Sequence, residues 1–79
     1  MEEKKIYVTY LSHWDDEFDR FTTIEQVAAD TGLESESGGT AAGGMQDSDW
    51  YVTEAEKTVL LDWFQSKGLL DKVTVGEPE

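Results

Sequence analysis

The single histidine of this 79-residue chain stands beside its densest run of acidic side chains, and these two residue types together can do chemistry. An imidazole such as that of His13, with the carboxylates of Asp15, Asp16 and Glu17 nearby, can ligate a metal ion or act as a general base. Ligands from one short turn rarely fill three or four coordination positions, however, and the chain has no second histidine. The run is more typical of a solvated turn, so the sequence predicts no metal site, no catalytic residue and no cofactor.

Other signatures of catalysis are weak. The segment GGTAAGG lacks the Lys-Ser/Thr pair of a phosphate-binding loop, and it does not follow a strand in the dinucleotide-binding pattern. Cysteine is absent, and one histidine would have to serve any serine or threonine nucleophile. Paired carboxylates cleave glycosides in a deep cleft, which so small a domain can hardly enclose. The sequence therefore predicts that the protein is not an enzyme.

Charge is the strongest signal that remains. Eighteen acidic and six basic residues leave a formal net charge of −12, and from Asp15 to Asp49 ten acids face one base, Arg20. Direct binding to nucleic acid or to an anionic membrane is disfavoured, because both require clustered lysines and arginines. A dense negative array can instead occupy the basic groove of a nucleic-acid-binding protein. Electrostatic steering would then act over about 8 Å at physiological salt, and aromatic side chains would supply desolvated anchors.

The candidate residues for such an interaction fall into two sets. The candidate phosphate surrogates are Asp15, Asp16, Glu17, Asp19, Glu34, Glu36, Asp47 and Asp49. The candidate aromatic contacts are Trp14, Trp50 and Tyr51.

Length and composition predict one folded domain over residues 1–79. Apolar residues make up 38% of the chain and nine residues are aromatic, which is enough for a small core. No apolar run approaches the roughly 18 residues of a membrane helix, and the N-terminus lacks the pattern of a secretory signal. We therefore expect no membrane association and a cytoplasmic location.

The first half of the chain predicts two strands and a helix. Residues 5–11 alternate as a strand should, with Ile6, Val8 and Tyr10 on one face and Tyr7, Thr9 and Leu11 on the other. Residues 17–21 suggest a weak second strand that would form a hairpin with the first. Thr22 and Glu25 have the spacing of a capping box, which predicts a short helix ending at Gly32.

The second half predicts a loop, a strand, a longer helix and a last strand. Residues 34–48 are rich in glycine, serine and acids and are expected to form a flexible loop. A short strand at 49–52 should precede a helix at about 54–67, which has a capping box at Thr53 and Glu56 and ends at Gly68. Its expected apolar face is Ala55, Val59, Leu60, Trp63 and Phe64. Residues 72–75 should add a strand, and residues 76–79 a frayed acidic tail.

Together these elements predict an α+β fold in which two helices pack on one face of a small, mainly antiparallel sheet, with a long Gly-rich acidic loop. In an alternative arrangement only the two helices pack together, and the N-terminal strand lies at an edge of the sheet.

In size, acidity, lack of cysteine and aromatic-punctuated α+β pattern, the whole chain resembles the small anti-defence proteins of bacteriophages. These include anti-CRISPR proteins, anti-restriction proteins and uracil-DNA glycosylase inhibitors, many of which are DNA mimics. The resemblance is one of overall profile and includes no sequence motif. It implies a stoichiometric inhibitor in the bacterial cytoplasm that blocks the DNA-binding groove of a CRISPR effector or another DNA-processing complex.

Two other interpretations stay open from the sequence. A small interaction or adaptor domain would use its aromatic surface rather than its charge, as a monomer or as a homodimer joined through the edge strand at residues 6–10. A salt-adapted protein would be acidic for solubility alone. In this chain, however, lysines outnumber arginine five to one and glutamates outnumber aspartates ten to eight, and neither ratio is expected of a salt-adapted surface.

Overall fold

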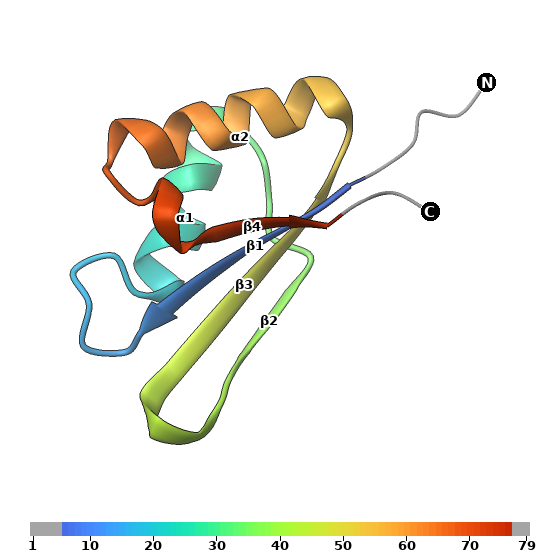
Figure 1. Cartoon of the computed structure of the whole chain (residues 1–79). Coiled ribbons are helices and arrows are strands. Elements are labelled where there is room, and N and C mark those ends of the chain that lie inside the picture. The colour runs from blue at the N-terminus through green and yellow to red at the C-terminus, as the bar shows by residue number, and fades with distance from the viewer. Residues whose placement is uncertain (1–5, 77–79) are drawn as a thin grey trace.

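A computed structural model describes residues 6–76, which form a four-stranded sheet covered on one side by two helices (Figure 1). The predicted α+β fold with a small antiparallel sheet is confirmed. The elements, in chain order, are β1 (Ile6–His13), α1 (Arg20–Thr31), β2 (Ser37–Thr40), a 3-10 turn η1 (Ala42–Gly44), β3 (Met45–Val52), α2 (Glu54–Ser66), a 3-10 turn η2 (Leu70–Lys72) and β4 (Val73–Gly76).

The strand order is β2-β3-β1-β4, and every neighbouring pair is antiparallel. The long strands β1 and β3 form the centre and pair along their whole length, from Ile6 opposite Val52 to His13 opposite Met45. The short strands β2 and β4 are the edges. The N-terminal strand is therefore central, which makes the alternative of an edge strand wrong.

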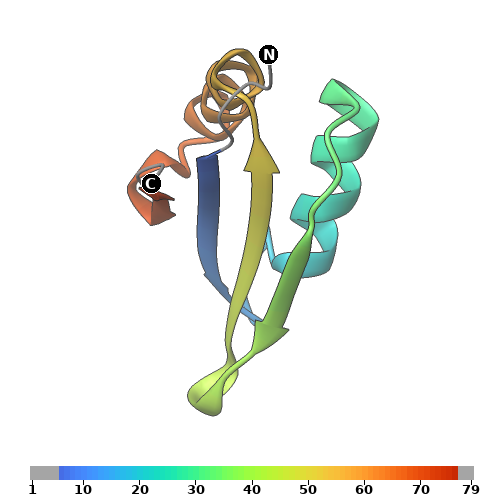
Figure 2. The same cartoon turned by 90° about the vertical axis from the view of Figure 1, so that its right-hand side faces the viewer.

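Alternation along the central strands separates a buried face from an open face. Ile6, Val8 and Tyr10 lie under the helices, whereas Tyr7 and Leu11 lie on the other side and are exposed, as the sequence predicts. Both helices lie on the same side of the sheet (Figure 1). The hairpin formed by β2 and β3 extends past them at one end (Figure 2). One face of the sheet is thus left without a covering layer among residues 6–76.

An aromatic cluster forms the core between the sheet and the helices. Phe64 of α2 is fully buried and lies 5.0 Å from the ring of Tyr10 and 5.7 Å from that of Trp50, between ring centroids. Trp63 packs edge-on against Phe64, and its Nε1–H donates to Asp30 of α1 at 2.8 Å. Burial raises the pKa of the Tyr10 phenol. This cluster joins both helices to the central strands.

The second helix begins where its capping box predicts. Thr53 accepts a hydrogen bond from the backbone N–H of Glu56, and Glu56 accepts one from that of Thr53. The buried face is narrower than expected, because Leu60, Trp63 and Phe64 are buried while Ala55 and Val59 are exposed. At about 100° per residue, Val59 lies a quarter turn away from the centre of the buried stripe.

The start of α1 differs from the prediction. Asp19, not Thr22, is the N-cap, and its carboxylate accepts the backbone N–H of Thr22 at 2.8 Å. Thr22 already lies in the first turn, where it cannot act as a cap. The predicted strand at 17–21 is therefore wrong, because Phe18 lies in the connection and its ring packs edge-on against Trp63. The helix ends at Gly32, which has a positive φ of 79° as expected.

The predicted loop at 34–48 is also wrong over most of its length. Residues 37–40 form β2, residues 42–44 form the 3-10 turn, and β3 begins at Met45 rather than Asp49. The hydrophobicity pattern of the sequence does not reveal the alternation of β3, because two of its buried positions are the polar residues Gln46 and Ser48. Gly38 fits beside α1 because it lacks a side chain, since a Cβ there would lie 2.6 Å from Nε of Arg20.

The C-terminal strand, predicted at 72–75, is confirmed as β4, with a shift of one residue. Gly76, expected to start a frayed tail, is the last residue of that strand, and 77–79 lie outside the described residues.

Candidate partner-binding surface

The structure places the eight predicted acidic residues in three parts of the molecule rather than in one array. Four lie in the connection from β1 to α1: Asp15, Asp16, Glu17 and Asp19. Asp47 and Asp49 lie on the open face of the sheet, and Glu34 and Glu36 lie between α1 and β2.

Three of these carboxylates hold the fold together. Asp19 caps α1, Asp16 accepts the backbone N–H of His13 at 2.8 Å, and Asp49 accepts the hydroxyls of Thr9 and Ser37. The hydrogen bond from the backbone N–H of His13 lowers the pKa of Asp16, and that from Thr22 lowers the pKa of Asp19. Their first role is therefore structural.

The other five carboxylates make no hydrogen bond or ion pair with any residue between 6 and 76. They are Asp15, Glu17, Glu34, Glu36 and Asp47. All but Asp47 are exposed, and Asp47 is half-buried. These five residues are available to a basic partner without loss of an internal contact.

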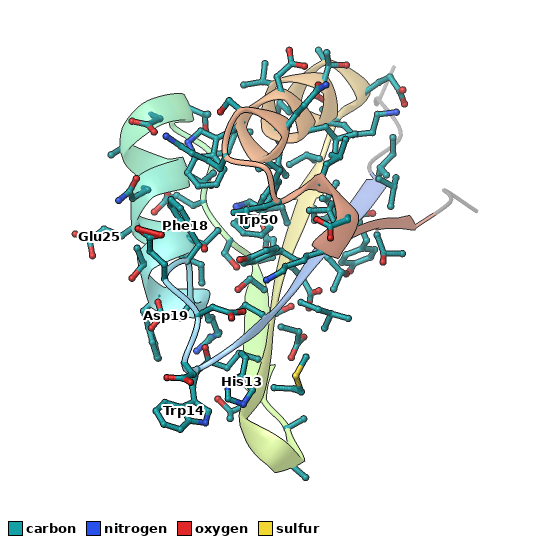
Figure 3. All side chains as sticks on the ribbon, turned by 60° about the vertical axis from the view of Figure 1, so that its left-hand side comes forward. His13, Trp14, Phe18, Asp19, Glu25 and Trp50 are labelled. Carbon is teal, nitrogen blue, oxygen red and sulfur yellow. The ribbon has the colours of Figure 1, made fainter. Side chains whose placement is uncertain are left out.

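The three predicted aromatic contacts differ sharply in exposure. Trp14 is 61% exposed and Tyr51 is 40% exposed, with the Tyr51 ring stacked on Tyr7 at 4.5 Å between centroids. Trp50, in contrast, is completely buried beneath the helices (Figure 3). The prediction that Trp50 contacts a partner is therefore wrong. The alternation of β3 turns even-numbered residues toward the core, so Trp50 and its neighbour Tyr51 point to opposite faces.

Trp14 is held at one end of the molecule by two segments that are distant in the sequence. We call this end the tip and define it as residues 13–19 together with 41–44. The backbone N–H of Trp14 donates to the carbonyl of Gly44 at 2.9 Å, and the His13 ring lies 3.0 Å from the carbonyl of Gly43. Gly44 has a φ of 82°, and a Cβ on it would lie 2.0 Å from the Trp14 ring. The glycine therefore lets the turn lie directly against the indole.

His13 uses both ring nitrogens inside the tip. Its Nδ1 accepts the backbone N–H of Asp15 at 3.1 Å, which makes Nε2 the protonated nitrogen that donates to Gly43. Neither nitrogen is therefore directed at a metal or a substrate. Among residues 6–76 no group of three or more histidine, aspartate and glutamate side chains is placed to hold a metal ion.

Two exposed residues of the open face, Leu11 and Met45, are not among the contacts that the sequence predicts. Leu11 is 46% exposed and Met45 41% exposed. Together with His13, Asp16, Asp71 and Lys72 they line a shallow pocket of about 440 Å³ beside the start of β4. The alternation of residues 5–11 already indicated that Leu11 faces away from the core. The sequence gives no such signal for Met45, because its composition predicts a loop where β3 begins.

Among the helices of residues 6–76, none has the length and apolar character needed to cross a membrane. Comparison with protein-family models, with curated proteins and with solved structures finds no match for this chain. The resemblance to phage anti-defence proteins therefore stays a prediction.

Proposed function

We propose that this protein is a non-catalytic, stoichiometric inhibitor that mimics nucleic acid and occupies the basic groove of a DNA-binding protein, such as a bacterial CRISPR effector. The observation that carries the proposal is the tip. There an exposed indole, Trp14, stands beside the unpaired carboxylates of Asp15 and Glu17, on backbone fixed by internal hydrogen bonds.

Such an arrangement suits a partner that normally binds phosphates. Unpaired carboxylates steer a basic groove toward the tip, and the effect weakens as salt screens the charges. An exposed tryptophan supplies the kind of side chain that dominates binding energy at protein interfaces. Because the hydrogen bonds of His13 and Asp16 already order the loop, little conformational entropy remains to be lost on binding.

The second candidate function is a small adaptor domain that binds through aromatic contact alone. The exposure of Trp14 also favours this function. The two candidates differ in salt dependence, because an interface without charge pairs keeps its affinity as ionic strength rises.

The test begins with the tagged protein and nuclease-treated lysates of bacteria that carry CRISPR or restriction systems. Captured proteins are eluted by a salt gradient or by competing duplex DNA. Mimicry predicts a DNA-binding protein that is released by both. A partner that resists both would favour the adaptor.

A matched pair of variants then locates the contact on the purified complex. Asp15→Asn/Glu17→Gln removes two charges from the tip, and Glu25→Gln/Asp62→Asn removes two exposed charges from the helices. Glu25 projects outward from α1 (Figure 3). The proposal predicts that the first double variant weakens binding and reduces its salt dependence while the second does neither. Equal losses would mean that only net charge matters, and would refute a contact at the tip.

A further inference from the structure

The open face of the sheet carries a strip of exposed apolar side chains along its two central strands. Tyr7 is 53% exposed, Leu11 46%, Met45 41% and Tyr51 40%, and all four lie on β1 and β3. The cross-strand pairs place Tyr7 opposite Tyr51 at one end and His13 opposite Met45 at the other. The strip therefore runs along both central strands and ends at the tip.

Small residues at the sheet edges leave this strip uncovered. Gly39 of β2 is opposite Asp47, and Gly76 of β4 is opposite Tyr7. Opposed residues of an antiparallel pair share a face, so both glycines lie on the open face and add no side chain to it. Beside Asp47 and Tyr7, therefore, no edge side chain stands next to the central strand, whereas Ser37 and Thr74 lie opposite Asp49 and Thr9 on the same face.

The centre of the strip is acidic. Asp49 and Asp47 lie between the tyrosine pair and Met45, and the hydroxyls of Thr9 and Ser37 orient the Asp49 carboxylate. The four basic residues between positions 6 and 76 lie at or beside the helices and η2, and none lies on a strand. Lys72, which lines the same pocket as Leu11 and Met45, is paired with Asp16 at 3.4 Å.

Charge decides which occupant fits this face. A second copy of the chain would bring the same two carboxylates against each other, on a protein whose formal net charge is already −12. A nucleic acid would bring phosphates against them. A segment rich in arginine and apolar side chains matches all the parts of the strip, because guanidinium groups pair with carboxylates and also stack on tyrosine rings.

We propose that the open face, defined by Tyr7, Leu11, Met45, Asp47, Asp49 and Tyr51, is a docking surface for an arginine-bearing, partly apolar segment of a protein partner. The inference rests on the proposed function for the basic character of the partner and adds a second contact next to the tip. The docking surface and the tip consist of different residues, so an experiment can refute one proposal without refuting the other.

The test is a titration of the ¹⁵N-labelled full-length chain, followed by NMR. The probe is a short peptide of alternating arginine and leucine, and the controls are a glutamate–leucine peptide of the same length and a single-stranded oligonucleotide. We expect the arginine peptide to shift amide signals of β1 and β3, the two controls to leave them unchanged, and added salt to weaken the binding.

Two variants test which side chains of the open face contact the peptide. Tyr7→Leu keeps an apolar side chain but removes the ring face, and Asp47→Asn keeps the shape but removes the charge. Each should weaken peptide binding roughly two- to fivefold, as expected for exposed cation–π and ion-pair contacts. Val59→Ala, at an exposed apolar position of α2, should have no effect. Circular dichroism of each variant shows whether it is folded.

Several outcomes would overturn the proposal: equal binding of the glutamate peptide, shifts caused by the oligonucleotide, arginine-peptide shifts concentrated on the helices or the tip, or sedimentation as a dimer that Tyr7→Leu dissociates. Trp14→Ala distinguishes the two proposals. It should abolish capture of a groove-binding partner while leaving the peptide affinity of the open face unchanged.

Discussion

Replacement of Gly44 by alanine tests how the tip is built. The added Cβ would lie 2.0 Å from Cδ1 of Trp14 and 2.3 Å from its Nε1, so the indole or the turn has to move. The residue also has a φ of 82°, a conformation that costs an L-residue about 1–2 kcal/mol. Overpacking of a fitted contact adds typically about 1–3 kcal/mol. We expect Gly44→Ala to lower the free energy of unfolding by about 2–5 kcal/mol, falling toward the backbone cost of about 1–2 kcal/mol if Trp14 swings away.

The neighbouring Gly43 offers a matched control. It has nearly the same φ, 79°, but a Cβ on it would meet nothing within 4 Å. Gly43→Ala therefore carries only the backbone cost, and the difference between the two variants isolates the contacts of the added Cβ with the Trp14 ring and with Nε2 of His13, which would lie 2.9 Å away. Urea unfolding followed by far-ultraviolet circular dichroism measures both, because this signal does not depend on Trp14 fluorescence.

A double-mutant cycle completes the test. In a Trp14→Ala background the indole is gone and only the close approach to Nε2 of His13 remains, so the excess cost of Gly44→Ala over Gly43→Ala should fall sharply. If the two glycine variants are equally destabilised in the wild-type background, the indole does not lie against the turn and this description of the tip is wrong.

Three further predictions concern the helices and the core. Thr53→Ala removes one hydrogen bond of the capping box and should destabilise the protein by about 1 kcal/mol in urea unfolding, whereas Thr58→Ala, at an exposed position later in the same helix, should cost clearly less. Because the fold lowers the pKa of Asp19, this carboxylate stabilises the protein above its ordinary pKa of 3.8, and the stabilisation is lost as pH falls through the lowered pKa. Asp19→Asn keeps a capping side chain but should remove this loss of stability at acid pH. An unchanged dependence of stability on pH would contradict the role of Asp19 as the charged cap of α1. Phe64→Ala should cost about 3–5 kcal/mol, since its ring contacts three other aromatic rings, and a loss below 1 kcal/mol would show that the core is packed differently.

The parts of the fold that the sequence predicts well depend on neighbours in the chain. The start of α2 follows from Thr53 and Glu56, three residues apart, and the end of α1 from Gly32. The two faces of β1 follow from strict alternation. Such features need no knowledge of what lies across the fold.

The parts that could not be predicted depend on tertiary contacts. Gln46 and Ser48 are buried although they are polar, because β3 lies between β1 and β2 and passes under α1. Two capping residues compete at the start of α1, and Asp19 forms the cap although Thr22 matches the capping-box spacing. The side of the sheet on which Trp50 lies depends on the strand register, which aromatic composition does not reveal.

The candidate site was predicted in part. Trp14, Asp15 and Glu17 are exposed as expected, and Tyr51 lies on the open face. The sequence does not show that the glycines of residues 41–44 fold back onto Trp14, because that contact joins positions about thirty residues apart.

The two halves of the tip meet only when the central strands are in register, so the tip cannot exist in a chain that has formed its helices but not its sheet. A ligand that holds residues 13–19 and 41–44 together would consequently favour the complete fold over every partly unfolded form. Its binding should raise the melting temperature with increasing ligand concentration and should slow proteolysis at sites throughout the domain, including sites far from the contact. For a chain of this length, capture by a target and protection from degradation would then be the same event.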